Sequence, residues 1–407
     1  MNNPNDGLKY LLLDLNSYFA SCEQELDSHL RGKPIAVVPM LNVETTCCLA
    51  ASYEAKAFGI KTGTLVKEAK QMCPDIIFVQ AQHEHYVYFH HQIINAVESC
   101  IHIAQVLSID EMLCELTGSQ KKIEIAVELS KKIKTTIRSK VGQCLRCSIG
   151  LSTNPFLAKV ASDMKKPDGL TLILKKDLPE LLYTLKLRDF PGIGPQMEKR
   201  INQFGIVSVK QLCQLTQTEM KKLWGGINGD RFYLWLQGED VSLPHSKSQS
   251  LGHQHVLEPK LRDRKSAYQV TQKLLIRAAR RLRREGFYTK KISLHVRFAD
   301  LYDSFDSYEN LEETQDTLTL LHAITRLWEK LPQHKPFKVG VTLSNLIEEK
   351  HHQFSLFKTE SRENLMQTID KINDKFKDKV YFGALCDRNQ AATTKIAFRR
   401  IPKMSEF

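Results

Sequence analysis

Apolar residues follow two different spacings along the first part of the chain. Short apolar runs at 10–13, 35–38 and 76–79 are typical of buried strands. A short helix is expected at 52–58, and a longer one at 124–141, where every fourth residue is apolar and predicts a core-facing stripe of Ile125, Leu129, Ile133 and Ile137. We therefore expect the first ~170 residues to form an α/β or α+β region.

The pattern changes in the second part of the chain. Residues 178–238 are expected to be wholly helical, with short turns marked by glycine, and the polar stretch 242–250 is interpreted as a linker. The residues after it predict a small α+β domain that ends near Leu346, with a helix, a strand, a helix and a strand at 265–285, 292–298, 315–331 and 337–343.

Length and charge narrow the possible classes of protein. A chain of 407 residues exceeds one hydrophobic core, so three or four domains are expected. The 58 Lys and Arg residues outnumber the 46 Asp and Glu residues, giving a net charge of +12. Such a charge suits a polyanion such as nucleic acid, although an acidic membrane or solubility alone would also explain it.

Targeting and disulfide signals are absent from the sequence pattern. Residues 1–7 lack the basic and apolar regions of a signal peptide, and no apolar run is long enough to span a membrane. We expect the ten cysteines to be reduced thiols of a cytoplasmic protein. Cys144 and Cys147 have C-x-x-C spacing, but no second pair completes a zinc site.

Carboxylates stand at the ends of two apolar strands that are far apart in sequence. Asp14 ends the run that begins at Tyr10, and Asp110 and Glu111 follow the strand-like residues 104–109. A buried, unpaired carboxylate is costly, so these positions make sense if the acids face a shared cation. Two Mg²⁺ ions held in this way can clamp the oxygens of a phosphoryl transfer. Taken one at a time, each acid is more simply explained as a surface residue.

The three acids belong to a set of four motifs that follow one another along the chain. The motifs are 14–23, 108–111, 148–152 and 157–169. Together they resemble the Y-family translesion DNA polymerases, and the resemblance runs from about Leu8 to Leu346. It implies an α+β multidomain fold of the right-hand polymerase type, divided into palm (1–17 and 83–173), small fingers (18–82), helical thumb (174–241), linker (242–250), α+β little finger (251–347) and a tail (348–407).

The resemblance also implies an active site. Asp14, Asp110 and Glu111 would be the catalytic carboxylates and, with the main-chain carbonyl of Leu15, would hold two Mg²⁺ ions. Glu115 matches no ligand and is expected to be a bystander. The dNTP would contact Tyr18, Phe19, Tyr53, Lys56 and Lys166. In that set Phe19 would be a steric gate against a ribose 2′-OH, although Tyr18 and Phe19 could both be packing residues. Lys56 stands where family members often carry Arg, and a lysine there keeps the charge but loses bidentate geometry.

Two basic segments are candidates for contact with primer-template DNA. Residues 190–197 resemble a helix-hairpin-helix loop, in which Gly192 and Gly194 would let backbone N–H groups approach phosphates, with Lys199 following. Residues 273–291 form the most basic stretch, a helix expected to bury one face and to present basic residues that include Arg280, Arg281 and Arg284. A run of charge is otherwise simply a solvated face.

The end of the chain carries a candidate partner motif. Gln353, Leu356 and Phe357 resemble the pentapeptide that binds the bacterial sliding clamp. About fifty residues follow this motif, an arrangement that could indicate a UmuD-like accessory subunit. The role of residues 358–407 is not assigned.

The sequence therefore predicts a template-directed DNA polymerase that copies damaged bases with low fidelity. Two other functions stay open. One is a non-catalytic Y-like scaffold that binds DNA and clamp, which would not need the three acids. The other is a two-metal nuclease, which would not need the nucleotide-contacting set of Tyr53, Lys56 and Lys166.

Overall fold

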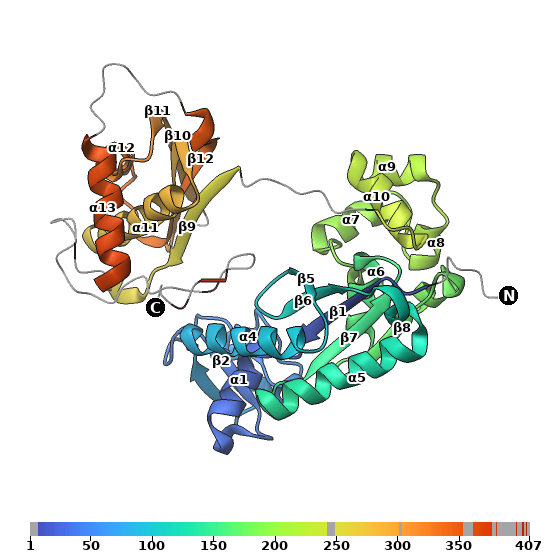
Figure 1. The fold of residues 1–407 in the computed structure, drawn as a ribbon. Coiled ribbons are helices and arrows are strands. Elements are labelled where there is room, and N and C mark those ends of the chain that lie inside the picture. Colours follow the sequence, from blue (N-terminus) through green and yellow to red (C-terminus); the bar gives the residue numbers. More distant parts are fainter. Residues whose placement is uncertain are drawn as a thin grey trace. The chain divides into compact units, whose positions relative to one another are not determined.

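The computed structural model describes residues 7–241, 249–300, 303–352 and 361–376, together with 380, 396, 401, 402 and 404. The chain divides into two compact units, which are described separately (Figure 1). Unit 1 comprises Met1–Leu243 and Lys395–Phe407, and unit 2 comprises Pro244–Thr394. The division falls within the predicted linker, of which residues 242–248 lie outside the described part of the chain.

The larger sheet of unit 1 has five strands with β1 at its centre. Its order is β5-β6-β1-β7-β8, and all neighbouring strands are antiparallel except β7 and β8. The strands are β1 (Tyr10–Leu15), β5 (Ile103–Val106), β6 (Glu111–Glu115), β7 (Cys147–Ser152) and β8 (Leu170–Ile173). β1 has a strand on either side, and its apolar residues are buried because both faces of the sheet are covered.

Helices cover both faces of this sheet. Leu11 and Leu13 belong to the core beneath α4 (His83–Glu98) and α5 (Ile123–Lys140), whereas Leu12 packs with Ala158 of α6 (Pro155–Met164). Successive side chains of a strand point to opposite faces, so Asp14 shares the α6 face with Leu12. This alternation determines where the predicted catalytic acid points.

The predicted stripe of α5 is wrong at its first position. Ile133 and Ile137 are fully buried, but Ile125 is 40% exposed, and Ala126 and Ser130 occupy the buried face in the first half of the helix. Each step of four residues overshoots a helical turn by about 40°, so a strict every-fourth row drifts off the core-facing side. Small residues at 126 and 130 complete the contact.

A second, smaller sheet in unit 1 has the order β3-β2-β4. Its strands are β2 (Ile35–Val38), β3 (Ala50–Ala51) and β4 (Ile77–Gln80), and the nearby helices are α1 (Tyr18–Leu26), α2 (Tyr53–Lys56) and α3 (Val66–Met72). Ser52 caps α2 by accepting a hydrogen bond from the backbone N–H of Ala55 at 3.2 Å. This short helix is the one predicted at 52–58.

The region from 178 to 238 is helical, as predicted. After two 3₁₀ turns come α7 (Pro195–Gln203), α8 (Val209–Cys213), α9 (Gln217–Trp224) and α10 (Ile227–Leu236). Their core continues into α6 through Phe156, which stacks on Trp235 with ring centroids 5.1 Å apart and meets Phe232 edge-on at 5.0 Å. The helix that faces Asp14 is therefore also the support of this helical region.

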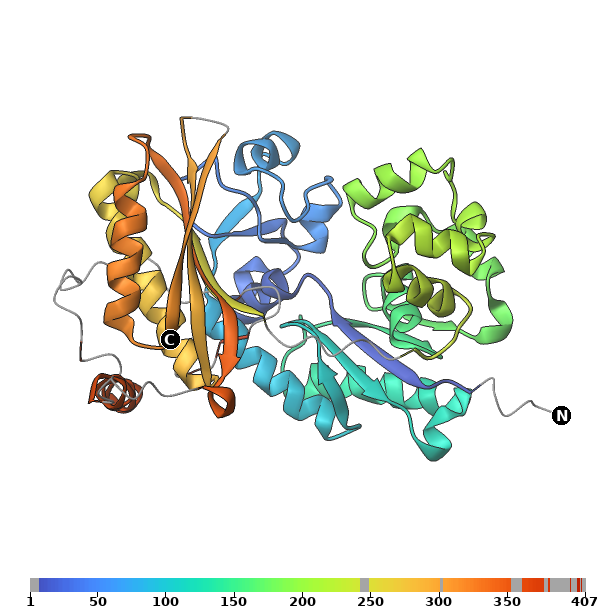
Figure 2. The same cartoon turned by 90° about the horizontal axis from the view of Figure 1, so that it is seen from above.

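Unit 2 is a four-stranded antiparallel sheet with helices packed on one face. The strand order is β11-β10-β12-β9, and both α11 and α12 contribute to its single large core. Figure 2 shows both helices on the same side of the sheet. The elements are β9 (Ser250–Val256), α11 (Arg264–Arg284), β10 (Phe287–Phe298), β11 (Ser304–Thr314), α12 (Thr317–Glu329), β12 (Pro336–Glu348) and α13 (Ser361–Phe376).

The predicted helices and strands of unit 2 are all present, but β9 and β11 were not predicted. β11 carries many polar and acidic residues on both faces, so its sequence lacks the apolar alternation of a half-buried strand. It lies at the edge of the sheet, where only one neighbour is available. Polar edge strands of this kind avoid pairing with other chains.

Candidate active site

Asp14 and Glu111 lie side by side at one end of the five-stranded sheet. They are direct partners in the antiparallel register of β1 and β6, and both point to the face covered by α6. Asp14 is buried, with 5% of its surface exposed. Directly opposed carboxylates repel one another, so this position requires compensating positive charge.

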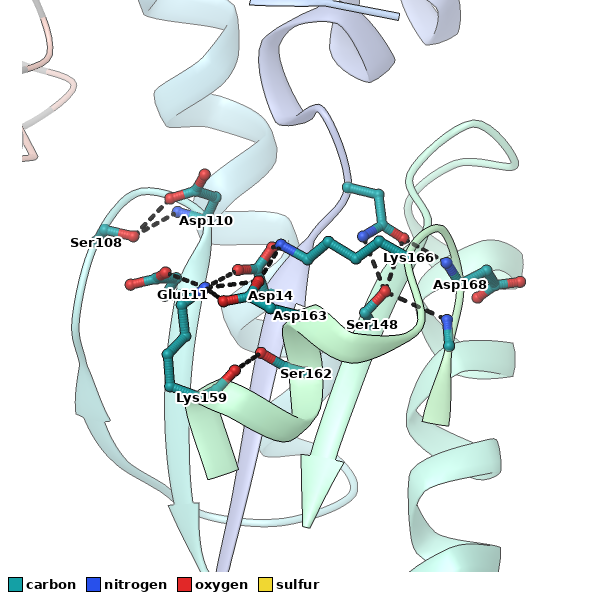
Figure 3. Close-up of polar contacts among 12 residues, drawn as sticks. Asp14, Ser108, Asp110, Glu111, Ser148, Lys159, Ser162, Asp163, Lys166 and Asp168 are labelled. Atoms are coloured by element: carbon teal, nitrogen blue, oxygen red, sulfur yellow. Dashed lines mark hydrogen bonds and ion pairs between the residues drawn. The ribbon is translucent and has the colours of Figure 1, made fainter. Parts of the chain in front are cut away.

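Two lysines supply positive charge at this point (Figure 3). The Lys159 ammonium pairs with the Asp14 carboxylate, with Glu111 Oε1 at 2.8 Å and with Asp163 Oδ2 at 3.1 Å. Lys166 Nζ lies 2.6 Å from Asp14 Oδ1 and 2.8 Å from Asp163 Oδ1. Sequence reasoning had assigned no role to Lys159 or Asp163, although both fall within the quoted motif 157–169.

Asp110 is adjacent to this cluster, but its carboxylate turns away from it. The Ser108 hydroxyl donates to Asp110 Oδ1 at 2.5 Å, and the Asp110 carbonyl accepts from the backbone N–H of Leu15 at 2.9 Å. The acidic pair follows the strand β5, as predicted, with Asp110 directly before β6 and Glu111 as the first residue of β6. The structure thus brings two of the three predicted acids face to face.

The electrostatics of the cluster favour additional positive charge. Burial raises the pKa of the Asp110 carboxyl, and the charges of Asp14 and Glu111 raise it further. Burial lowers the pKa of the Lys159 ammonium, but the surrounding carboxylates raise it by more. The four carboxylates of Asp14, Asp110, Glu111 and Asp163 outnumber the two ammonium groups.

The donor atoms suit a hard divalent cation. Carboxylate and main-chain oxygens are the ligands that Mg²⁺ prefers, and Asp14 and Glu111 already converge on one positive group. Across the described ranges, no three Asp, Glu, His or Cys side chains are grouped closely enough to hold a metal ion. A third carboxylate would come from Asp110 if its side chain turned from Ser108 toward Asp14.

A network of backbone contacts holds the loop that carries Lys166. The Asp168 N–H donates to Asn16 Oδ1 at 2.7 Å, and the Gly169 N–H donates to Ser148 Oγ at 3.2 Å. Lys134 Nζ donates to the Asp168 carbonyl at 2.6 Å. A Cβ at Gly169 would lie 1.7 Å from a backbone oxygen, so only glycine fits there. Asn16, Ser148 and Lys134 are supporting residues that sequence reasoning missed.

Tyr53 and Lys56 of α2 belong to the same electrostatic neighbourhood. Lys56 Nζ lies over the Tyr53 ring, 4.4 Å from its centroid. Burial lowers the pKa of Lys56, the charge of Lys166 lowers it further, and Asp14 opposes the shift. The structure therefore places the three predicted triphosphate contacts around Asp14, while their roles remain predictions.

Tyr18 and Phe19 at the start of α1 have different environments. Tyr18 is buried, and its hydroxyl donates to the Tyr86 carbonyl at 2.6 Å, so it is a core residue. Phe19 is half-buried and stacks on the Tyr86 ring, with centroids 4.3 Å apart and planes at 14°. The Tyr86 hydroxyl donates in turn to Glu23 Oε1 at 2.5 Å. Of the two rings, only Phe19 retains substantial surface for a ligand.

The predicted DNA contacts lie in both units. Gly192 has a φ of 89°, which favours glycine, and Gly194 directly precedes α7, the helix that carries Lys199. In α11, Arg280 pairs with Asp374 at 2.6 Å and Arg281 with Glu285 at 2.6 Å. Arg284 also takes part in interactions.

The tail helix α13 supplies acidic partners to arginines of α11. The sequence predicted a helix with a basic face at 273–291, and in the structure Asp374 of α13 pairs with Arg280 on that helix. Asp370 of the same helix forms a bidentate pair with Arg283, at 2.6 and 3.0 Å. The clamp-motif residues Gln353, Leu356 and Phe357 lie outside the described residues.

Three family models match successive parts of the chain. The impB/mucB/samB family matches residues 13–163, the DNA polymerase-iota thumb domain matches 188–240, and the impB/mucB/samB C-terminal domain matches 248–356. The first match includes Asp14, Asp110, Glu111 and Lys159. The exact domain boundaries predicted from the sequence remain predictions.

Curated relatives extend over almost the whole chain. DNA polymerase IV of Pelotomaculum thermopropionicum is 32% identical over 373 residues, covering 90% of this chain and 92% of the relative. DNA polymerase IV of Moorella thermoacetica is 31% identical, covering 92% and 95%. DNA polymerase IV 1 of Bacillus subtilis is 28% identical, covering 95% of each.

Solved structures have the same fold. A Y-family DNA polymerase chimera of Dbh and Dpo4 matches with a TM-score of 0.70 at 24% identity, covering 84% of this chain and 99% of that one. A post-insertion binary complex of Dbh DNA polymerase matches with a TM-score of 0.57 at 25% identity and the same coverage. The fold is thus that of the right-hand Y-family polymerases, which confirms the predicted fold class.

Sequence and fold agree on the assignment. The chain belongs to the impB/mucB/samB family of Y-family DNA polymerases. None of the helices in the described ranges is long and apolar enough to cross a membrane.

Proposed function

We propose that this chain is a DNA-directed DNA polymerase that performs low-fidelity translesion synthesis. The primer 3′-OH loses its proton and its oxygen bonds to the α-phosphorus of a dNTP, while the bond to the β-phosphate breaks and pyrophosphate leaves. The observation that carries this proposal is the convergence of Asp14, Glu111, Lys159 and Lys166 at one end of the sheet, in a chain whose relatives are DNA polymerase IV.

The carboxylates would hold the divalent cations of the reaction. Asp14, Asp110 and Glu111, with the Leu15 carbonyl, form the set that we assign to two Mg²⁺ ions. When bound, such ions offset the charge that develops on the attacking and leaving oxygens. The surplus of carboxylates over ammonium groups supports this assignment, because it leaves the cluster electrostatically incomplete.

Tyr53, Lys56 and Lys166 would bind the triphosphate. Both lysines can neutralise phosphate charge, and the loop contacts of Asp168 and Gly169 fix the backbone next to Lys166. The ring of Phe19 would lie against the sugar and exclude a 2′-OH.

In the parent protein, nucleotide affinity is expected to fall as the pH becomes alkaline. Replacing Lys56 with Arg should prevent this fall. The lowered pKa of Lys56 means that its positive charge is lost at a lower pH than in an ordinary lysine, whereas Arg stays charged. In the parent protein the KM for dNTP should rise at a lower pH than the one at which an ordinary lysine loses its charge, and in Lys56→Arg it should stay flat and several-fold lower at that pH.

Steady-state single-nucleotide insertion across the alkaline pH range is the measurement. Lys61→Arg, a change at an exposed lysine of the same region, is the matched control and should keep the parent profile. Because the pKa of Lys166 is raised, that lysine should not contribute to the change. An equal alkaline rise in Lys56→Arg would show that Lys56 does not bind the triphosphate.

DNA would be bound without sequence preference by two elements. Gly192 and Gly194 would bring backbone N–H groups at the start of α7 to a phosphate, with Lys199 nearby. Arg280, Arg281 and Arg284 of α11 would add charge from unit 2. Their existing acidic partners mean that contact with DNA would require exchange of Asp374 and Glu285 for phosphates.

Neutralising Arg280, Arg281 and Arg284 together to Gln is expected to flatten the salt dependence of DNA affinity. The slope of log K against log salt should fall by about one for each phosphate that an arginine no longer neutralises. Fluorescence anisotropy with a primer-template at several salt concentrations measures it, with Arg326→Gln as a control, since Arg326 pairs with Glu309. If these arginines only bind the acids of unit 2, the slope will be unchanged and the thermal stability lower.

Further partners belong to the same proposal. Gln353, Leu356 and Phe357 would bind the bacterial sliding clamp, and a UmuD-like subunit could contact the tail. A cytoplasmic location follows from the DNA substrate.

The second candidate is a non-catalytic scaffold, favoured by the Asp110 carboxylate that faces Ser108 rather than Asp14. Primer extension separates the two functions.

A further inference from the structure

Lys159 is the most strongly engaged side chain of the catalytic centre, and the proposed reaction gives it no task. Its ammonium group touches carboxylates from three elements: Asp14 of β1, Glu111 of β6 and Asp163 of its own helix (Figure 3). Two of these carboxylates are assigned above to cations. Before any divalent cation binds, Lys159 therefore supplies positive charge to these two carboxylates.

We propose that Lys159 is a positioning residue that holds Asp14 and Glu111 together in the free protein and passes to Asp163 when divalent cations bind. This inference rests on the proposed function, because it uses the cation-binding role of the two acids. Asp163 is then a second positioning residue, which receives the ammonium group and keeps it beside the site.

The first half of the proposal follows from charge and register. Asp14 and Glu111 are directly opposed across β1 and β6, where like charges destabilise the pair. Lys159 bridges them, at 2.8 Å from Glu111 Oε1 and in contact with Asp14. With this bridge, the repulsion between the two carboxylates is offset before a cation arrives, and both stay directed toward the α6 face.

The second half follows from what a cation would do. A divalent ion on Asp14 repels an ammonium group a few ångströms away, and the repulsion is strong in a partly buried site. Lys159 already contacts Asp163 at 3.1 Å, one helical turn along α6, so a side-chain rotation completes the transfer. Lys166 is in the same situation, with Asp14 on one side and Asp163 at 2.8 Å on the other.

Asp163 is suited to this exchange by its exposure. Its side chain is 35% exposed, against 7% for Asp14, so it can carry a second ammonium partner next to solvent. It would also keep Lys166 near the site once Asp14 is occupied, with the lysine's remaining N–H groups available to phosphate oxygens.

The test is Mn²⁺ binding to the full chain without DNA or dNTP, with free Mn²⁺ quantified by electron paramagnetic resonance. Lys159→Met removes the competing ammonium group and is expected to tighten Mn²⁺ binding about tenfold. Asp163→Asn leaves both lysines on the cation ligands and should weaken binding several-fold, while Asp163→Glu should restore it. Lys131→Met, on the exposed side of α5, is the control and should bind as the parent protein does.

Insertion kinetics supply a second readout. In Asp163→Asn the KM for dNTP should rise by more than kcat falls, because Lys166 loses its second partner, and Asp163→Glu should reverse this change. Lys159→Met should lower kcat even though it binds Mn²⁺ more tightly. A purely structural role would instead lower the melting temperature of the variants and leave their Mn²⁺ affinities equal to that of the parent protein.

The outcomes separate this inference from the proposed function. Weaker or unchanged Mn²⁺ binding in Lys159→Met, or unchanged binding in Asp163→Asn, overturns the positioning role even if the parent protein extends primers. If Lys159→Met does not fold, Asp163→Asn and Asp163→Glu still decide the matter. If the Mn²⁺ affinities of the parent protein and its variants rank as expected but the parent protein never extends a primer, only the polymerase assignment is contradicted.

Discussion

Replacing Asp14 with Asn is expected to lower the rate of primer extension at least about a thousandfold, equivalent to ~4 kcal/mol of transition-state stabilisation. Asp14 is the carboxylate on which both lysines converge, and it opposes Glu111 in the strand register. Without its charge, two ammonium groups would face a site that must hold divalent cations. The effect should be on kcat, because the interaction that Asp14 supplies develops in the transition state.

The same strand pair offers a matched control. Glu115 is exposed and lies at the other end of β6, opposite Tyr10, so Glu115→Gln removes one carboxylate from the same sheet without touching the cluster. Glu115→Gln should extend primers at the parent rate, and thermal unfolding should show Asp14→Asn to be folded. Comparable losses in both variants, or near-normal extension by Asp14→Asn, would contradict the assigned role of Asp14.

Replacing Phe19 with Ala is expected to lower discrimination against ribonucleotides by on the order of a hundredfold, or about 2.7 kcal/mol. The Phe19 ring is half-buried and held in place by its stack on Tyr86. An alanine there leaves space for a 2′-OH without removing any group assigned to the cations or the triphosphate. Insertion of dNTP should therefore change only a few-fold, while insertion of the matching ribonucleotide rises.

The ratio of kcat/KM for dNTP to that for rNTP is the quantity to compare. Tyr18→Phe is the control, because Tyr18 is buried and the change keeps its ring while removing the hydroxyl that bonds to the Tyr86 carbonyl and to Cys22. The stacked pair contributes about 0.5–1.5 kcal/mol to stability, so Phe19→Ala should also melt at a lower temperature. Lower stability with unchanged sugar discrimination would show that Phe19 is a packing residue.

Much of the fold could be predicted from the sequence, and the misses have physical causes. Apolar runs identified β1, β2 and β4, and β1 and β2 are buried as predicted, whereas β4 is only partly buried. The polar edge strand β11 carried no such signal. Ile125 was misplaced because a row of every fourth residue drifts around a helix, which only the packing partners of α5 reveal.

The candidate site was predictable in its residues but not in its geometry. The motifs located Asp14, Glu111 and Lys166, which the structure brings together. They could not show that the Asp110 carboxylate turns to Ser108, since that depends on a turn between two strands. Lys159 and Asp163 were visible only as members of a motif, because their importance comes from contacts between segments far apart in sequence.

The basic helix α11 shows a similar limit. Its arginines were recognisable as a cluster, but the acids that pair with them lie about ninety residues later, on α13. A charge run counted in sequence takes no account of such partners. For this reason the role of Arg280, Arg281 and Arg284 depends on the salt experiment rather than on their number.

Primer extension by the parent protein beside Asp110→Ala, with Mg²⁺, four dNTPs and a labelled primer-template, tests the polymerase assignment most directly. We predict template-directed extension by the parent protein, including past a damaged base, and none by Asp110→Ala. Shortening of the primer would indicate a nuclease. Absence of extension by both proteins, with DNA binding intact, would indicate a scaffold and contradict the proposed function.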